Sequence, residues 1–185
     1  KEDKIGYIMD NSRHEKSVSS DTKYDELQKL ITGSNGPDFF IGYEDKDRQD
    51  ILLRSDRDVM LCFKEYFGSS DKIIKFKNLK KNDVIDFLKL NFDGDYTNTD
   101  DSCIFKLSAA SKSDPASFFG IKKNSTLAEV RDIFSKVKTR PIKKLSFLDS
   151  DHDIIEILGD TEWEYFINDC DIQYKKGKFN TLYAE

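Results

Sequence analysis

The chain has 185 residues and a net charge of −5, with 35% charged and 37% apolar residues. This length suits one large domain or two small ones, and the 14 Phe and 8 Tyr residues supply enough core material to exclude general disorder. The acidic balance gives no general case for nucleic-acid binding. No run of 18 apolar residues is present, so we expect no membrane span.

Strand and helix patterns alternate at the start of the chain. Extended runs are expected at residues 4–9, near Val18, and at residues 72–77, where the sequence reads KIIKFK. A first helix is expected to place Leu27, Leu30 and Ile31 on one apolar face. A second helix follows Ser55, a residue suited to the N-cap, and its apolar stripe comprises Val59, Cys62, Phe63 and Tyr66.

Residues 78–102 differ from the segments on either side. The run NDVIDFLKL predicts a short helix with Val84, Phe87 and Leu88 on one face, although a strand fits it equally well. The run DGDYTNTDDS that follows is polar and is typical of a loop. We therefore interpret residues 79–102 as a linker.

The same alternation returns after the linker. Strands are expected at residues 103–107, near Phe119 and at residues 178–184. Thr126 and Glu129 form a capping box ahead of a helix whose apolar face comprises Val130, Ile133, Phe134 and Val137. A second, short helix is expected to bury Trp163, Phe166 and Ile167.

Two acidic segments align without a gap at an offset of about 104 residues. Residues 43–59 read YEDKDRQDILLRSDRDV and residues 147–163 read FLDSDHDIIEILGDTEW. An aromatic residue opens each one, apolar residues keep the same places, and acids correspond in four pairs: Asp45 with Asp149, Asp47 with Asp151, Asp56 with Asp160, and Asp58 with Glu162. Acidity alone would not keep the apolar positions in register, so this pattern indicates a duplication. Each copy then reads strand, strand, helix, strand, strand, helix, strand, which predicts an α+β unit with helices on one face of a mixed sheet.

This order of elements and the acidic pattern resemble PB1 domains, which have the ubiquitin-like β-grasp fold, and the acidic segment is similar to that family's OPCA motif. The resemblance implies two PB1-like domains in tandem, at residues 1–78 and 103–185. It also implies protein–protein interaction, in which the acidic arc of one domain meets a basic cluster centred on a first-strand lysine of another. Such charge complementarity favours specificity and fast association.

Carried over to the second copy, the resemblance implies an acidic partner-binding set of Asp149, Asp151, Asp153, Asp160 and Glu162. The first-strand lysine would be Lys106, with Lys112, Lys122 and Lys123 extending the basic face. A domain that carries both poles can associate front to back with further copies. We therefore expect a scaffold or adaptor module that pairs with another PB1-like domain or with itself, and that can form homo-oligomers.

The first copy departs from the family pattern. Its acids, Asp45, Asp47, Asp56 and Asp58, alternate with Lys46, Arg48, Arg54 and Arg57. Its first strand has no lysine flanked as Lys106 is, and Lys4 is the nearest candidate. The first copy is interpreted either as a binder or as a structural companion of the second.

Several alternatives stay open at this point. The acidic segments could be solvated turns, or residues 149–160 could be a calcium loop, although Ile154 stands where an EF-hand requires Gly. The chain could be a ubiquitin-like regulatory region of a larger enzyme. A further alternative is an RNA-associated module that uses Lys75, Lys77, Lys80 and Lys81.

Catalysis finds little support in the sequence. No GxSxG, HExxH, P-loop or CxxC motif occurs, so we expect no enzyme activity, catalytic residue, cofactor or metal. The three cysteines, Cys62, Cys103 and Cys170, are far apart and are expected to be buried thiols. The first residues do not resemble a signal peptide, and we expect a cytoplasmic protein that begins inside a longer chain.

Overall fold

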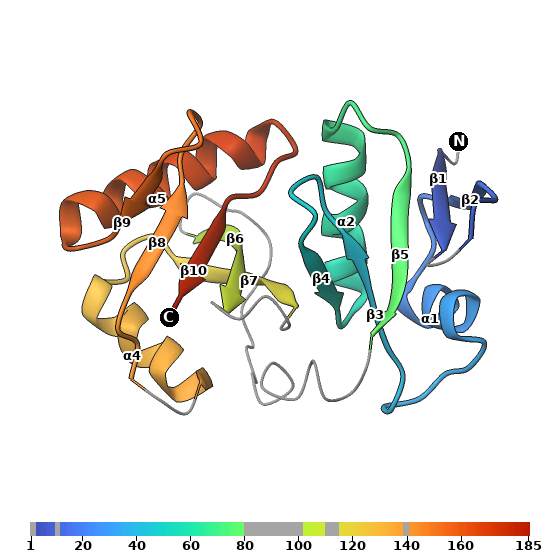
Figure 1. Ribbon diagram of the computed structural model, residues 1–185, viewed down its shortest axis with the longest axis horizontal. Coiled ribbons are helices and arrows are strands. Elements are labelled where there is room, and N and C mark those ends of the chain that lie inside the picture. Colours follow the sequence, from blue (N-terminus) through green and yellow to red (C-terminus); the bar gives the residue numbers. More distant parts are fainter. Residues whose placement is uncertain (1–2, 10–11, 80–101, 110–114, 139–140) are drawn as a thin grey trace. The chain divides into compact units, whose positions relative to one another are not determined.

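The computed structural model describes residues 3–9, 12–79, 102–109, 115–138 and 141–185. The chain divides into two compact units, Lys1–Val84 and Ile85–Glu185, which we call unit 1 and unit 2 and describe separately (Figure 1). The predicted helix within residues 78–102 lies outside the described residues. Lys80, Lys81 and Lys112 lie outside them as well.

The described part of unit 1 contains two helices and a five-stranded mixed sheet. The helices are α1 (Tyr24–Thr32) and α2 (Asp56–Gly68), and the strands are β1 (Lys4–Met9), β2 (Lys16–Ser19), β3 (Phe40–Glu44), β4 (Asp50–Leu53) and β5 (Ile74–Leu79). The strand order is β2-β1-β5-β3-β4. β1 and β5 are parallel, and the other neighbours are antiparallel.

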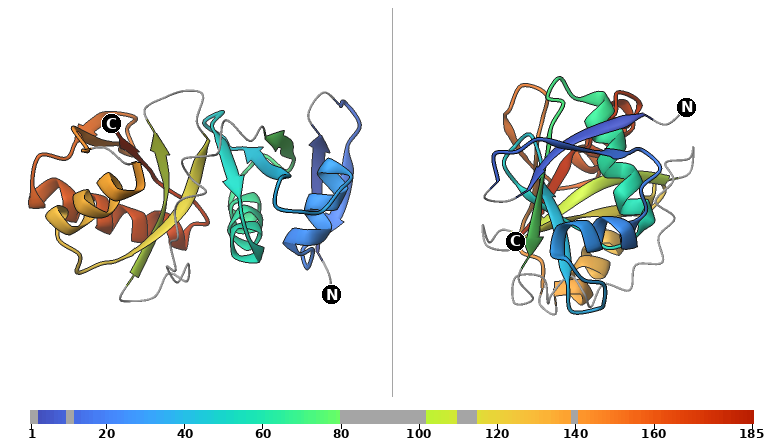
Figure 2. Two further views of the ribbon diagram at one scale, coloured as in Figure 1. Left: turned by 90° about the horizontal axis from the view of Figure 1, so that it is seen from below. Right: turned by 90° about the vertical axis from the view of Figure 1, so that its right-hand side faces the viewer.

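Unit 2 repeats this topology over the residues that the structure describes. Its helices are α4 (Leu127–Lys138) and α5 (Asp160–Lys175), and its strands are β6 (Ser102–Ala109), β7 (Ala116–Lys122), β8 (Leu145–Leu148), β9 (Ile154–Glu156) and β10 (Thr181–Ala184). The order is β7-β6-β10-β8-β9, with β6 and β10 parallel and the other neighbours antiparallel. Each strand of unit 2 therefore has a counterpart in unit 1 at the same place in the sheet, and Figure 2 gives two further views of these elements.

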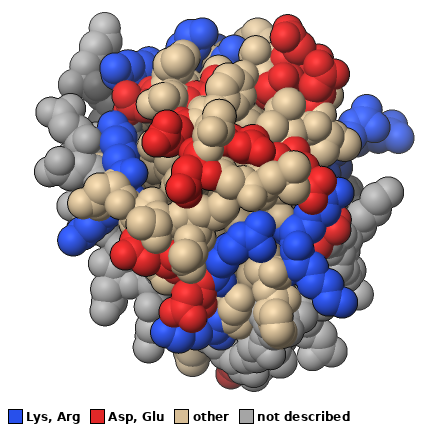
Figure 3. Space-filling view, turned by 90° about the vertical axis from the view of Figure 1, so that its left-hand side faces the viewer, with Lys and Arg blue, Asp and Glu red and all other residues tan. Residues whose placement is uncertain are grey.

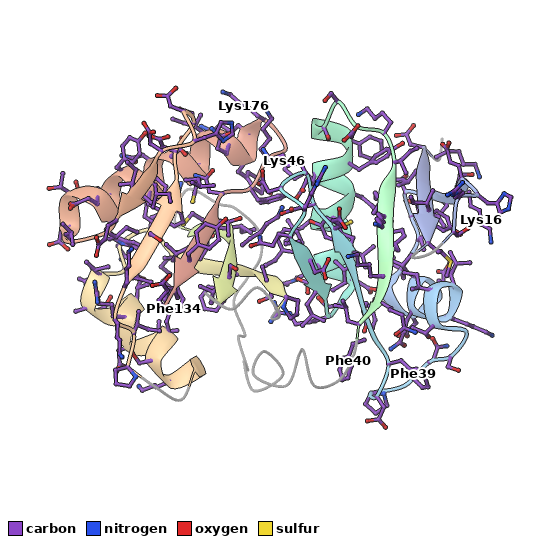
Figure 4. The ribbon with its side chains drawn as sticks, viewed as in Figure 1. Lys16, Phe39, Phe40, Lys46, Phe134 and Lys176 are labelled. Atoms are coloured by element: carbon purple, nitrogen blue, oxygen red, sulfur yellow. The ribbon has the colours of Figure 1, made fainter. Side chains whose placement is uncertain are left out.

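Aromatic side chains fill the core of unit 2 between its sheet and its helices. Phe134 of α4 packs edge-on against Phe119 at 5.2 Å between ring centroids, and Phe166 of α5 contacts Phe105 and Phe147. Figure 4 labels Phe134 on α4, beside the strands. The predicted apolar faces of both helices are confirmed at Val130, Phe134, Trp163, Phe166 and Ile167, all of which are buried. α5 is longer than predicted, since it has 16 residues and buries Cys170 in its second half.

The predicted capping box is present at the start of α4. Thr126 Oγ1 accepts a hydrogen bond from the Glu129 backbone N–H at 3.2 Å, and Glu129 Oε2 accepts one from the Thr126 N–H at 2.9 Å. Two backbone donors that the helix leaves unpaired are thereby satisfied. The Trp163 indole N–H donates to the neighbouring Ser125 carbonyl at 3.1 Å, which joins the start of α4 to α5.

In unit 1 the predicted face of α1 is only partly right. Leu27 and Ile31 are buried, but Leu30 is 43% exposed. The buried place beside Leu27 is taken by Gln28, whose amide N–H groups donate to the Gly36 carbonyl at 2.9 Å and the Phe39 carbonyl at 2.7 Å. These bonds tie α1 to the loop before β3, where the Phe39 side chain is exposed (Figure 4). A polar side chain that satisfies loop carbonyls can replace an apolar one at a buried position.

The three cysteines are buried free thiols, as predicted. Burial raises the pKa of the Cys103 thiol to about 12, although the nearby Lys123 ammonium acts in the opposite direction. Burial also raises the pKa of Cys170 well above its ordinary value. Thiolates are the reactive form of cysteine, so these two side chains are chemically quiet in the folded protein.

Candidate functional site

The acidic segment of unit 1 begins with a tight turn between β3 and β4. Asp45 Oδ1 accepts hydrogen bonds from the backbone N–H groups of Asp47 at 3.0 Å and Gln49 at 2.9 Å. The Asp45 N–H donates to the Gln49 carbonyl, and Arg48 has a left-handed backbone with φ of 60°. Asp45 is only 6% exposed. This carboxylate therefore shapes the turn from within.

The turn between β8 and β9 has the same construction. Asp149 Oδ1 accepts from the N–H groups of Asp151 and Asp153, both at 2.9 Å. The Asp149 N–H donates to the Asp153 carbonyl, and His152 has a φ of 64°. An Asp side chain that bonds the backbone two residues later is a common way to close a turn. The first acid of each motif is thus engaged inside the chain, and its role toward a partner stays a prediction.

The strand registers show which residue of unit 1 stands at the place of Lys106. In unit 1, Phe76 of β5 pairs with Tyr43, and the preceding residue Lys75 pairs with Ile8 of β1. In unit 2, Leu182 of β10 pairs with Phe147, and the preceding residue Thr181 pairs with Lys106 of β6. Ile8 therefore occupies in β1 the position that Lys106 occupies in β6. Lys4 lies four residues earlier and pairs with Ser19 of β2, so it is not the counterpart of Lys106.

The other acids of the unit 1 motif are largely used within the unit. The Asp58 side chain is fully buried, and its Oδ2 accepts from the Arg54 backbone N–H at 2.8 Å and the Arg54 Nε at 3.1 Å. Burial raises the pKa of Asp58, and the Arg54 guanidinium lowers it by a smaller amount. Asp56 Oδ1 accepts from the N–H of Tyr24, the first residue of α1, at 2.8 Å. Asp47 is exposed at the turn.

The corresponding acids of unit 2 face solvent. Asp151, Asp153 and Asp160 are exposed and Glu162 is half-buried. Among the residues that the structure describes, none of these four carboxylates forms an ion pair. Figure 3 shows acidic side chains, in red, gathered among uncharged ones on this side of unit 2. We call Asp151, Asp153, Asp160 and Glu162 the acidic surface.

Two local features keep the acidic surface in place. Asp160 and Glu162 lie in the first turn of α5, where the helix dipole favours negative charge. Tyr165, one turn further, stacks on Phe147 at 5.6 Å between ring centroids. Desolvation, followed by the negative charges of Asp169, Asp149 and Asp151, raises the pKa of Tyr165. Asp151 is the member of the acidic surface that contributes to this shift.

The predicted basic residues of unit 2 are in different environments. Lys106 is 1% exposed on the sheet face opposite the helices, where it pairs in register with Phe118 and Thr181. Lys122 lies on the same face, near the end of β7, and is exposed. Lys123 donates to Asp171 of α5 at 3.1 Å. Among the members of this predicted set that the structure describes, Lys122 is therefore the one that presents its charge to solvent.

The lysines of β5, considered above for RNA, are paired with acids. Lys77 contacts Asp50 at 2.9 Å and Glu44 at 3.2 Å, and Lys75 contacts Glu44 at 3.6 Å. Burial opposes the charged form of Glu44, but the two lysines together hold its pKa below the ordinary value. The described part of this basic stretch is thus partly neutralised within unit 1.

The profile of the PB1 domain family matches residues 4–77, from the first residue of β1 into β5. A PB1 domain is found at residues 4–77. PB1 domains have the ubiquitin-like β-grasp fold of the α+β class and mediate protein–protein interaction. The match covers unit 1, and no curated protein matches the chain.

Metal-binding sites and membrane-spanning helices are two other kinds of feature that a chain of this composition could contain. Within the described ranges, no group of three or more His, Cys, Asp or Glu side chains is placed to bind a metal ion. No helix among those residues has the length and apolar character needed to cross a membrane.

Sequence reasoning missed the internal use of Asp45 and Asp149. The signal was available, since each Asp is followed by polar residues at the second and fourth positions, a spacing that suits a side-chain-closed turn. It also missed the burial of Asp58 beside Arg54, because a buried acid and base four residues apart have the same sequence spacing as an exposed pair.

Proposed function

We propose that unit 2 is a second PB1-like domain and that the chain acts as a protein-interaction adaptor through the acidic surface of unit 2. Two features support the assignment of unit 2. Its strand order repeats that of unit 1, and its β8–β9 turn repeats the hydrogen bonds of the β3–β4 turn. A shared topology together with a shared turn is what a duplicated domain would retain.

The observation that carries the proposal is the contrast between the two sets of acids. In unit 1, Asp56 and Asp58 bind the backbone or a base of their own unit. In unit 2, the corresponding Asp160 and Glu162 form no ion pair with a described residue. Clustered like charges repel one another, and they create a local field that attracts a basic partner.

The partner that fits this surface is a PB1-type domain that presents a lysine cluster on its first strand. A single exposed ion pair contributes only about 0–1 kcal/mol. Several carboxylates around one partly desolvated lysine could contribute a few kcal/mol together. Because the attraction is between charges, the affinity should fall as salt rises.

We propose that the acidic surface receives a different protein rather than a further copy of this chain. Front-to-back association of copies requires a lysine that can meet the acidic surface of the next copy. Lys106 is buried and Lys123 is paired with Asp171, which favours a chain that receives a different protein. Unit 1, with Ile8 at the lysine position and Asp58 buried, fits a structural companion.

The RNA alternative gains less support than protein binding does. Phosphate contacts need lysines whose charge is available, whereas Lys75 and Lys77 are paired with Glu44 and Asp50. A regulatory region of a larger enzyme would use the same acidic surface toward another segment of its own protein. The test below applies to both arrangements, because it identifies the surface used.

The experiment is a calorimetric titration of the full chain with PB1 domains that carry the first-strand lysine and have their own acidic motif neutralised. The test variant is Asp151→Asn with Asp153→Asn, and the matched control is Asp25→Asn with Asp47→Asn, which removes the same charge from exposed positions of unit 1. We expect the test variant to lose at least about tenfold in affinity and the control to bind like the wild type. Equal losses in both variants would sink the proposal.

A further inference from the structure

β9 forms the last strand of the unit 2 sheet and is paired on one side by β8 (Figure 1). Asp149 donates to the Asp153 carbonyl, and Ile157 donates to the Leu145 carbonyl, so alternate residues of this segment point toward β8. In an antiparallel ladder the residues between them direct N–H and C=O to the other side. Ile154 and Glu156 therefore present their backbone groups at the outer edge of the sheet.

Two large apolar side chains flank this edge and are strongly exposed. Ile154 is 72% exposed and Leu158 is 74% exposed, whereas Ile157 between them is fully buried. The fold does not require apolar residues at these places. The corresponding positions of unit 1 are Asp50 and Arg54, which are ion-paired with Lys77 and Asp58. Exposed apolar side chains at an open strand edge mark a site where another strand can add.

The charges around the edge indicate what kind of strand would fit. Glu156 on β9 is exposed, as are Asp151, Asp153 and Asp160 on either side of the strand. Like charges directly opposite each other destabilise a strand pair, and opposite charges stabilise it. A second copy of β9 would set acid against acid. A strand carrying Lys or Arg would pair its charges with these carboxylates and cover the two apolar side chains.

We propose that β9 binds an extended segment with alternating basic and apolar residues, supplied by a partner protein, which adds to the unit 2 sheet as a further strand. Main-chain hydrogen bonds to Ile154 and Glu156 would supply affinity, and the flanking acids and apolar residues would select the sequence. This site shares Asp151, Asp153 and Asp160 with the acidic surface of the proposed function, but it also requires the outward backbone groups of β9, on which that function does not depend.

The test uses the full chain and a synthetic peptide of alternating Lys and Val, with blocked ends. The variant Ile154→Pro removes one outward N–H and leaves the charge unchanged, and an edge strand tolerates Pro where no ladder bond is lost. Ile154→Val keeps the N–H and serves as its control. We expect Ile154→Pro to weaken binding at least about tenfold and Ile154→Val to bind nearly as the wild type does.

A second measurement leaves the protein untouched. The same peptide with an N-methyl group on every Lys and Val amide keeps its charge but has no N–H group on either edge with which to pair as a strand. We expect the wild-type chain to bind the unmethylated peptide and to lose the methylated one. If both peptides bind equally, or if Ile154→Pro changes nothing, the attraction is charge alone and the site is overturned. If Ile154→Pro instead dissolves a dimer of the free chain, a second copy is the occupant and the basic strand is wrong.

The same variant separates this site from the proposed function. Ile154→Pro should leave binding of a lysine-bearing PB1 domain unchanged, since Ile154 is not part of the acidic surface. If the Ile154→Pro variant no longer binds the Lys–Val peptide but still binds the PB1 domain, the β9 site is supported independently of the proposed function. Loss of the domain in Asp151→Asn with Asp153→Asn reports on the proposed function instead.

Discussion

Asp45 and Asp149 make the same pair of backbone hydrogen bonds in two turns that lie about 104 residues apart in the chain. Each Oδ1 accepts from the residues two and four positions later, and each turn has one left-handed residue at the third position. The first acid of each motif is therefore engaged in holding a hairpin turn. The acids at the start of the following helix differ between the units, because Asp56 and Asp58 are engaged within unit 1 whereas Asp160 and Glu162 form no ion pair with a described residue.

The first prediction concerns stability at this turn. Asp149→Ala removes the acceptor of two exposed backbone N–H groups, and it should lower the unfolding free energy of unit 2 by about 0.5–1.5 kcal/mol. Asp151→Ala removes an exposed side chain and should change that free energy by less than about 0.5 kcal/mol. Urea unfolding followed by the fluorescence of Trp163, the single Trp of the chain and part of unit 2, measures both.

Asp149→Asn is the matched control for this comparison, since it removes the charge but keeps an oxygen acceptor. It should be closer to the wild type than Asp149→Ala. Equal destabilisation by the Ala changes at residues 149 and 151 would show that Asp149 has no special part in the turn.

The second prediction concerns the pH dependence that Asp58 confers. Burial raises the pKa of this carboxyl in the folded chain above the unfolded value of about 3.9. Between these two values the folded state binds more protons than the unfolded state, so Asp58 destabilises the fold as pH rises through that window. The unfolding free energy of the wild type relative to Asp58→Asn should therefore decrease from acid toward neutral pH.

Denaturant unfolding at a series of pH values, followed by far-ultraviolet circular dichroism, measures this difference. Asp47→Asn is a control, because it removes a carboxylate of the same unit from an exposed position. A wild-type advantage over Asp58→Asn that grows with pH would contradict the assignment, and would mean that the Arg54 pair outweighs burial.

The third prediction concerns the thiols. Burial raises the pKa of Cys103 to about 12 and that of Cys170 well above the ordinary value, so both are protonated and shielded near neutral pH. Iodoacetamide should leave them unmodified in the native chain and alkylate them in denaturant. Peptide mass spectrometry reads each site separately. Rapid native labelling of Cys103 would show that the β6 side of the core opens easily.

The fourth prediction concerns the helix cap at Thr126. Thr126→Ala removes the acceptor for the Glu129 N–H and should lower the unfolding free energy of unit 2 by about 0.5–2 kcal/mol, whereas Thr126→Ser should keep most of the bond. The Trp163 fluorescence transition reports this loss, since its indole bonds to the adjacent Ser125. Equal stability of the Ala and Ser variants would mean that the cap contributes nothing.

Periodicity in the sequence was enough to predict most of the core. The apolar stripes of α2, α4 and α5 follow helical spacing, and residues such as Val59, Phe134 and Phe166 are buried as that spacing requires. The prediction that Leu30 lies on the buried face of α1 was wrong, because α1 buries Gln28 instead. The loop carbonyls that accept hydrogen bonds from Gln28 belong to residues 36 and 39. Such a long loop contact leaves no periodic trace in the sequence.

The candidate site was harder to predict than the fold. Alignment of the two acidic segments paired their carboxylates, and the bases among the acids of the first copy set that copy apart, but neither observation indicated which carboxylates are engaged within the chain. Whether a carboxylate faces solvent or its own backbone depends on distances of a few ångströms that composition does not encode. Asp58 and Glu162 illustrate this, since they share a place in the motif and one is buried against Arg54 while the other is half-buried without an ion pair in the described residues.

The measurement that tests the central claim most directly is a double-mutant cycle between the acidic surface and the first-strand lysine of a PB1 partner. Asp153→Lys on this chain and Lys→Glu on the partner should each weaken binding, and together they should restore much of it, with a coupling energy above about 0.5 kcal/mol. The same exchange at Asp47 of unit 1 should show no coupling. Coupling at Asp47 with none at Asp153 would contradict the assignment of the binding surface to unit 2.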